Sequence, residues 1–303
     1  MEALVTFRGH SRGVAAVAFS GDGECLATGG ADSRVNVWHC ATGELRVCCD
    51  AHDGGINGVC WTRDSAYVAS ASDDKTVRLW NAHTGALVRT FVGHTSYVLC
   101  VACHPLSTLL VSAGFDETIR LWDVQRGTCH RTIAAHSESI ASVDVSGDGS
   151  MIASCAHDGL IRLWDTSEGH CLRTLQHADM APVSFVRFSP SSLQLLTMSL
   201  DSAVRLWDVP NARVLRTYTG HVNEKYALAA AFVATSERVL VAAGSEDRRV
   251  HVWDAQTGVA LGQPAAAHRD VVIAVCAHPV LPLLATAALA EDASAAIWRV
   301  HST

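Results

Sequence analysis

Short segments in which apolar and small residues alternate recur along the whole chain, and polar turns separate them. Residues 14–19 (VAAVAF) form one such segment, residues 21–23 (GDG) form a turn after it, and residues 34–38 (RVNVW) end the same unit. Segments of about six residues with turns about every eight to twelve residues are typical of antiparallel β-strands. We therefore expect an all-β structure.

A tryptophan closes one of these segments seven times, at intervals of 42, 42, 42, 43, 46 and 45 residues. The seven are Trp38, Trp80, Trp122, Trp164, Trp207, Trp253 and Trp298. Six residues before them stand Asp32, Asp74, Asp116, Asp158, Asp201, Asp247 and Asp292, and 28 to 32 residues before them stand His10, His52, His94, His136, His177, His221 and His268. A unit of this length and signature is one four-stranded blade of a β-propeller. The sequence therefore predicts seven blades.

A hydroxyl completes the pattern in most units. Four residues before the aspartate stand Thr28, Ser70, Ser112, Ser154 and Thr197, but the sixth and seventh units have Ala243 and Ala288 there. A buried imidazole needs hydrogen-bond partners for its ring nitrogens, and a carboxylate and a hydroxyl would supply them. We therefore expect all seven histidines and all seven aspartates to be structural. In isolation they resemble hydrolase triads, but seven equivalent copies argue against a catalytic one, and we expect no catalytic residue.

The two ends of the chain are predicted to close the ring. Only residues 299–303 follow the last tryptophan, which is too short for another outer strand, whereas residues 3–8 (ALVTFR) have the pattern of one. We expect the N-terminal strand to complete the last blade, because closure protects strand edges. Residues 1–303 would then form one domain.

Composition limits the chemistry. The net charge is −7 and the chain has only two lysines, Lys75 and Lys225, so a nucleic-acid surface is not expected. The 11 cysteines fit buried thiols in a reducing compartment, and no basic and apolar leader is visible, so we expect an intracellular protein without a membrane segment. Residues 100–104 (CVACH) match a haem-attachment pattern, but a strand would point the two sulfurs to opposite faces. We expect no cofactor and no metal.

The chain resembles the WD-repeat family over its whole length. Residues 115–124 (FDETIRLWDV), 182–190 (PVSFVRFSP), 220–226 (GHVNEKY) and 269–279 (RDVVIAVCAHP) resemble, more specifically, the WD-repeat scaffold subunits of histone H3 lysine-4 methyltransferase complexes of the COMPASS type. The resemblance implies a non-catalytic, monomeric subunit of a hetero-complex. Its partners would be a SET-domain methyltransferase, other complex subunits and, in some members, the histone H3 tail. It also implies a nuclear location, and the sequence allows a cytoplasmic one as well.

In that family, one mouth of the central channel receives an arginine side chain from the methyltransferase or a histone tail. The resemblance places this rim at Ala15, Ala31, Asn57, Asp73, Leu99, Phe115, Ala141, His157, Ser184, Tyr226, Ala227 and Ala229. The family has phenylalanine at the positions of Leu99 and Ala229 and tyrosine at that of His157. Without the two aromatic faces, a bound guanidinium loses a cation–π contribution of about 1–2 kcal/mol.

The repeat pattern leads independently to a ring near the same mouth. The residues just before the seven aspartates are Ala31, Asp73, Phe115, His157, Leu200, Glu246 and Glu291. Three of them are carboxylates, which favour a positively charged ligand.

A second family surface, on the opposite face, binds an acidic and apolar segment of another core subunit. Leu206, Arg216 and Phe232 match that surface, whereas Ser191, Gln194 and Ala234 stand where the family has Asn, Tyr and Val. Phe232 would be exposed in such a site, but the sequence equally allows it to be a core residue. A general scaffold, such as a ubiquitin-ligase substrate receptor or a signalling adaptor, is the alternative function.

Overall fold

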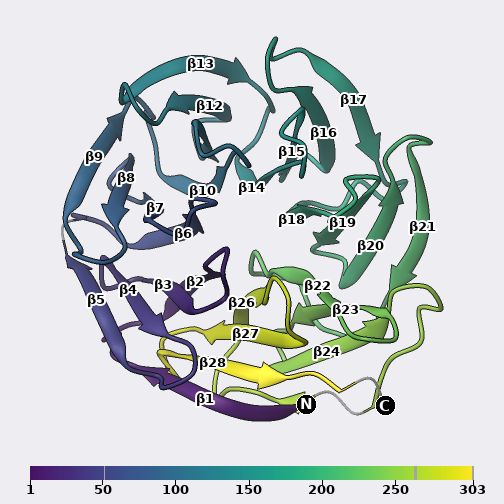
Figure 1. Ribbon diagram of the computed structural model, residues 1–303. Helices are drawn as coiled ribbons and strands as arrows, with labels where there is room; N and C mark the ends of the chain where they lie inside the picture. Colours follow the sequence, from purple (N-terminus) through teal and green to yellow (C-terminus); the bar gives the residue numbers. More distant parts are fainter. Residues whose placement is uncertain (51, 263–264, 302–303) are drawn as a thin grey trace.

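The structure is a computed structural model that describes residues 1–50, 52–262 and 265–301. Within these ranges the chain forms 28 β-strands, arranged in seven antiparallel sheets of four strands each. The sheets stand around a central axis as the blades of a propeller (Figure 1). The described residues contain no helix of the length and hydropathy needed to cross a lipid bilayer. The predicted all-β, seven-bladed propeller is confirmed.

The blades follow one another in sequence order. The first contains β2 (Val14–Phe19), β3 (Cys25–Gly30), β4 (Arg34–His39) and β5 (Leu45–Asp50); the second β6 (Ile56–Trp61), β7 (Tyr67–Ser72), β8 (Thr76–Asn81) and β9 (Leu87–Val92). The third contains β10 (Val98–Cys103), β11 (Leu109–Gly114), β12 (Thr118–Asp123) and β13 (Thr128–Ala134); the fourth β14 (Ile140–Val145), β15 (Met151–Ala156), β16 (Leu160–Asp165) and β17 (Cys171–Gln176). The fifth contains β18 (Val183–Phe188), β19 (Gln194–Ser199), β20 (Ala203–Asp208) and β21 (Arg213–Tyr218); the sixth β22 (Ala230–Ala234), β23 (Val239–Gly244), β24 (Arg249–Asp254) and β25 (Ala265–Ala266). The seventh contains β26 (Val272–Ala277), β27 (Leu283–Ala288), β28 (Ser294–Arg299) and β1 (Glu2–Arg8).

The ring closes where β1 pairs with β28. The pairing is antiparallel and runs from Glu2 opposite Arg299 to Arg8 opposite Ser294, with a bulge at Leu4. The N-terminal strand is therefore the outermost strand of the seventh blade, and it lies beside β28, the last strand of the chain (Figure 1). The predicted closure is confirmed.

Apolar side chains between neighbouring blades form the core. The cluster between the third and fourth blades, for example, joins Ile119 and Leu121 to Ile140 and Ile152, all of them buried. Because each strand places alternate side chains on opposite faces of its sheet, every blade contributes to the contact on either side of it. The repeated contacts build a ring from sheets that could not bury their faces alone.

The third blade shows the predicted network at full length. Trp122 Nε1 donates a hydrogen bond to Ser112 Oγ (2.7 Å), Ser112 Oγ lies 2.7 Å from His94 Nε2, and His94 Nδ1 lies 2.8 Å from Asp116. An ionised carboxylate only accepts, so Nδ1 carries the proton and Nε2 accepts from the hydroxyl. Burial alone would raise the pKa of Asp116, but hydrogen bonds from His94, Thr95 and Thr118 hold that pKa below its usual value.

The same network recurs in the first, second, fourth and seventh blades. Its members are Trp38, Thr28, His10 and Asp32; Trp80, Ser70, His52 and Asp74; Trp164, Ser154, His136 and Asp158; and Trp298, Thr286, His268 and Asp292. The expectation of Ala288 at the hydroxyl position was wrong, because the turn between β27 and β28 is two residues longer than in the other blades. Thr286 therefore lies 12 residues before its tryptophan, against 10 for Ser112.

The fifth blade departs from the prediction. Trp207 Nε1 still donates to Thr197 (3.0 Å), but His177 lies 3.3 Å from Asp179 with 32% of its side chain exposed. The buried guanidinium of Arg205 pairs with Asp201 in its place. The structural role expected for His177 was therefore wrong.

The sixth blade departs in another way. Ala243 offers no hydroxyl, Asp247 accepts from His251 Nε2 (2.9 Å), and Trp253 Nε1 donates to the Thr219 carbonyl (3.2 Å). His221 is only 3% exposed, yet neither ring nitrogen has a hydrogen-bond partner among the described residues. The expected pairing of His221 with Asp247 was also wrong.

Candidate functional site

Every blade has two different ends, so the propeller has two different faces. The turn between the second and third strands and the connection to the next blade lie at one end, and the other two turns lie at the opposite end. We call the first face the rim face, because the predicted rim residues lie on it, and the second the groove face. The two predicted surfaces are thus on opposite sides of the molecule.

Aromatic side chains mark one sector of the rim face. Phe115, in the turn between β11 and β12, is 51% exposed and packs edge-on against Tyr97, with ring centroids 5.8 Å apart. Leu99, on β10, and Ala229, just before β22, are half-buried. Tyr97 was missed by sequence reasoning. Its signal was its position two residues before Leu99, in the connection that leads into the innermost strand.

Polar rim residues are held by neighbours within the ring. Asn57 Nδ2 donates to Asp73 Oδ1 (2.7 Å) and to the Val98 carbonyl (3.0 Å), so Asn57 ties the second blade to the third. His157 Nδ1 lies 2.9 Å from Ser139 Oγ. The other carboxylate oxygen of Asp73 accepts no hydrogen bond from a described residue.

Glu246 organises the loop that carries two further rim residues. One oxygen of its carboxylate accepts the backbone N–H groups of Glu224 (2.8 Å), Lys225 (2.7 Å) and Tyr226 (3.2 Å). This fixes the loop so that the side chains of Tyr226 and Ala227 are exposed. Of the three ring carboxylates, Glu246 is therefore partly committed to the loop, while Asp73 and the exposed Glu291 contribute most to the field at the mouth.

The remaining rim residues differ in accessibility. Ala31 is exposed, whereas Ala15, Ala141 and Leu200 are half-buried. Ser184 is 2% exposed and lies beneath the Asn223 side chain, whose Nδ2 donates to it (3.5 Å). Ser184 thus does not reach the surface of the rim.

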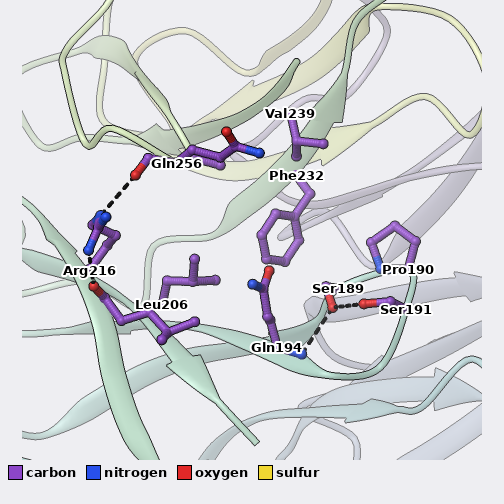
Figure 2. A pocket seen from close by; sticks show the side chains of 11 residues that line it. Ser189, Pro190, Ser191, Gln194, Leu206, Arg216, Phe232, Val239 and Gln256 are labelled. Carbon is purple, nitrogen blue, oxygen red and sulfur yellow. Dashed lines mark hydrogen bonds between the residues drawn. The ribbon is translucent and has the colours of Figure 1, made fainter. Parts of the chain in front are cut away.

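On the groove face, the structure gathers five of the six positions named for the second partner surface. Ser191, Gln194, Leu206, Arg216 and Phe232 line one groove of about 510 Å³ between the fifth and sixth blades, which we call the partner groove (Figure 2). Ala234 does not line it.

Phe232 and Arg216 define the chemistry of this groove. Phe232, half-buried on β22, points into the groove opposite Gln194 (Figure 2). Exposed Arg216 is held by two carbonyls: Nε donates to Gln256 O (2.9 Å) and Nη1 to Leu215 O (2.8 Å). Nη2 of Arg216 has no partner among the described residues, so the guanidinium can still donate to a ligand. The groove therefore combines apolar side chains with a cation that can form hydrogen bonds.

One group of side chains in the described part of the chain has the spacing of a metal site. Ligand atoms of His177, Asp179 and Asp201 lie within 4.8 Å of one another. Arg205 already binds the Asp201 carboxylate, so a cation would have to displace a guanidinium from it. The arrangement is therefore a poor metal site.

Comparison with known proteins extends these observations. A family model described as the WDR5 beta-propeller domain matches residues 6–299. An uncharacterized WD repeat-containing protein of Schizosaccharomyces pombe is 26% identical over 100 residues, a stretch that covers 33% of this chain and 33% of the relative. Because the match spans only a third of the relative, it supports the repeat and not a shared activity.

Proposed function

Because the chain belongs to the WDR5 beta-propeller family and is a WD-repeat protein-interaction scaffold, we propose that it assembles a histone H3 lysine-4 methyltransferase complex in the nucleus. A SET-domain partner would carry out the methyl transfer, and this chain would hold subunits together. The observation that carries the proposal is the partner groove, where five residues chosen from the sequence line one cavity.

The partner groove suits an acidic and apolar segment of another subunit. Leu206 and Phe232 offer apolar contact, and the exposed guanidinium of Arg216 offers a cation for a carboxylate. An aromatic side chain and an arginine are the residues that most often dominate binding energy at interfaces.

The rim suits an arginine side chain, held more weakly than in the family. Leu99 and Ala229 replace the aromatic clamp, at a cost of about 1–2 kcal/mol in binding free energy. Asp73 and the Tyr97–Phe115 pair remain beside the mouth. We therefore expect the groove to contribute more to assembly than the rim.

The test is affinity purification of the tagged protein from its native cells, with partners identified by mass spectrometry. The wild type should recover a SET-domain methyltransferase. Phe232→Ala should lower recovery of the subunit that binds the groove about tenfold, as for a central interface aromatic. Asp73→Ala should reduce an arginine-dependent partner about threefold.

Val92→Ala is the matched control, because Val92 is 73% exposed on the outermost strand β9 and lines neither surface. It should leave recovery unchanged. Because Phe232 also packs against the core and Asp73 accepts a hydrogen bond from Asn57, recovery is compared well below the melting temperature of each variant. Recovery of cullin adaptors or signalling proteins without any methyltransferase would contradict the proposal and favour the alternative scaffold.

A further inference from the structure

A second groove lies on the groove face, at the seam where the ring closes. It has a volume of about 590 Å³ and lies between the seventh and first blades. Leu4, Val5, Leu283 and Ile297 provide its apolar lining, with Leu281 at its mouth and Glu24 on the opposite wall. We call it the seam groove. Neither the family resemblance nor the rim and partner groove accounts for it.

The seam groove and the partner groove are built from equivalent positions of the repeat. Leu4 and Leu215 are equivalent, because each is the extra residue of the bulge in the outermost strand of its blade. The next residues are equivalent too: Val5 pairs with Ile297 in the seventh blade, and Arg216 pairs with Leu206 in the fifth. Leu283 and Gln194 both begin the second strand of their blades. Glu24 and Val239 are also equivalent, because their carbonyls accept the N–H groups of Cys40 and Ala255 in the same turn.

The two grooves carry opposite charges, at different positions of the repeat. The partner groove has a cation at Arg216 and an apolar residue at Val239, whereas the seam groove has Val5 and Glu24 at these positions. Glu24 is exposed, and its carboxylate makes no ion pair with any described residue. The seam groove is therefore a negatively charged counterpart of the partner groove.

Two histidines, His278 and His39, also line the seam groove. His278 Nδ1 accepts the N–H groups of Val280 (3.1 Å) and Leu281 (2.9 Å), and burial lowers the pKa of His278, so it is neutral at pH 7. His39 Nδ1 accepts the N–H of Thr42 (3.2 Å), which is in the turn that forms the same wall. Glu24 is the acidic side chain of the lining.

The mouth of the seam groove is apolar enough to indicate a macromolecular ligand. Leu4 is 39% exposed, Leu281 50% and the adjacent Val280 75%. Clustered exposed aliphatic residues around an open groove mark a protein-binding surface more often than a small-molecule pocket, which is enclosed.

We propose that the seam groove binds an extended segment of a partner protein that carries apolar side chains next to a lysine or arginine. The apolar side chains lie on Leu4, Leu283 and Ile297, and the basic side chain pairs with Glu24. The segment occupies the same face as the ligand of the partner groove but has the opposite charge. One partner subunit or two can therefore use both grooves at once.

The test is selection from a library of random ten-residue peptides displayed on phage, with the purified full chain as bait. Peptides that are lost when the bait carries Leu4→Glu are synthesised, and their Kd is measured by fluorescence polarisation. We expect them to contain two apolar residues and a lysine or arginine. Glu24→Arg should raise their Kd about tenfold, because it replaces an attraction by a repulsion.

Arg216→Glu is the matched control, since it reverses the charge of the equivalent partner groove and should leave these Kd values unchanged. Glu24 and Leu4 are exposed, so both variants should melt as the wild type does. Enrichment of acidic peptides at this groove, or of no peptide that depends on Leu4, would overturn the proposal. Neither result bears on Phe232, so the proposed function is tested separately.

Discussion

The third and sixth blades have the same strand order but different interiors. In the third, tryptophan, serine, histidine and aspartate form one closed chain of hydrogen bonds. In the sixth, the hydroxyl is missing, the aspartate has turned to His251, and His221 has no hydrogen-bond partner among the described residues. Both blades are nevertheless formed. The polar network therefore adds stability to a blade that apolar packing and strand pairing already specify.

The irregular blades are also those that carry the partner groove. The fifth and sixth blades form its walls. Around His221, stacking takes over part of the role of hydrogen bonds: His251 stacks on Trp253, with centroids 5.8 Å apart and planes at 21°. We therefore expect the fifth and sixth blades to have a smaller margin of stability than the third.

The largest effect should come from removing the aspartate of the third blade, and the same change in the sixth blade should cost less. Asp116→Ala leaves buried His94 without its carboxylate and also frees Thr95 N and Thr118, so we expect a loss of about 3 kcal/mol. Asp247→Ala should cost about 1 kcal/mol, because the Asp247 side chain is 30% exposed and its loss removes the hydrogen bond from His251. Urea denaturation of both variants measures the difference. Equal losses would mean that the network of the third blade has no special role.

The next largest effect is a dependence of the free energy of unfolding on pH, which arises from His221 in the sixth blade. Burial lowers the pKa of His221 to about 4; the nearby His251 acts in the same direction, while Asp247 and Asp201 oppose it. The unfolded chain takes up the proton near pH 6.5, so the folded state loses stability as the pH falls from about 6.5 towards 4. We expect a loss of about 2 kcal/mol between pH 7.5 and pH 5 from this residue.

His221→Leu isolates that contribution. Its free energy of unfolding should fall less steeply with pH than that of the wild type, measured by urea denaturation in matched buffers. Burial also lowers the pKa values of His136 and His268, and these contribute equally to both proteins. Parallel pH profiles would show that His221 does not titrate in this range.

The smallest effect should come from repairing the sixth blade. Ala243→Ser places a hydroxyl at the position of Ser112, where it can donate to His221 and accept from Trp253, for a gain of about 1 kcal/mol. Ala242→Ser is the control, because this neighbouring residue is also fully buried but faces the other side of the sheet. The first variant should melt at a higher temperature and the second at a lower one. A lower melting temperature for both variants would mean that the sixth blade has no room for the hydroxyl at position 243.

The fold was predictable because its signals repeat. Seven tryptophan and aspartate pairs at a constant spacing set the blade number, and the short tail after Trp298 indicated how the ring closes. The hydroxyl of the seventh blade was missed because a longer turn lies between Thr286 and Asp292. Counting back from the aspartate cannot detect an insertion in the turn itself.

The exceptions depend on which of several nearby partners each polar group takes. His177 pairs with Asp179, two residues further along the chain, and Arg205 takes Asp201 instead, although the third blade has Arg120 at the same position and there His94 keeps Asp116. The exposure of Phe232 depends on neighbours from two blades, and the burial of Ser184 depends on Asn223. The residues of the rim and the partner groove were predicted from the family resemblance. The seam groove could not be predicted in this way, because its lining residues come from segments far apart in the sequence.

Because β1 pairs with β28, the ring closes late in the synthesis and folding of the chain. Glu2 and Arg299 are neighbours in space, yet the ribosome must make all seven blades between them before they can pair. The intervening blades can fold one after another as they emerge, but β1 must wait as an unpaired strand until its partner appears. Closing so long a loop costs little more free energy than closing one half its length, so the delay is mainly one of time. During that interval the exposed edges at the seam are the part of the nascent propeller most open to chaperones and to neighbouring chains.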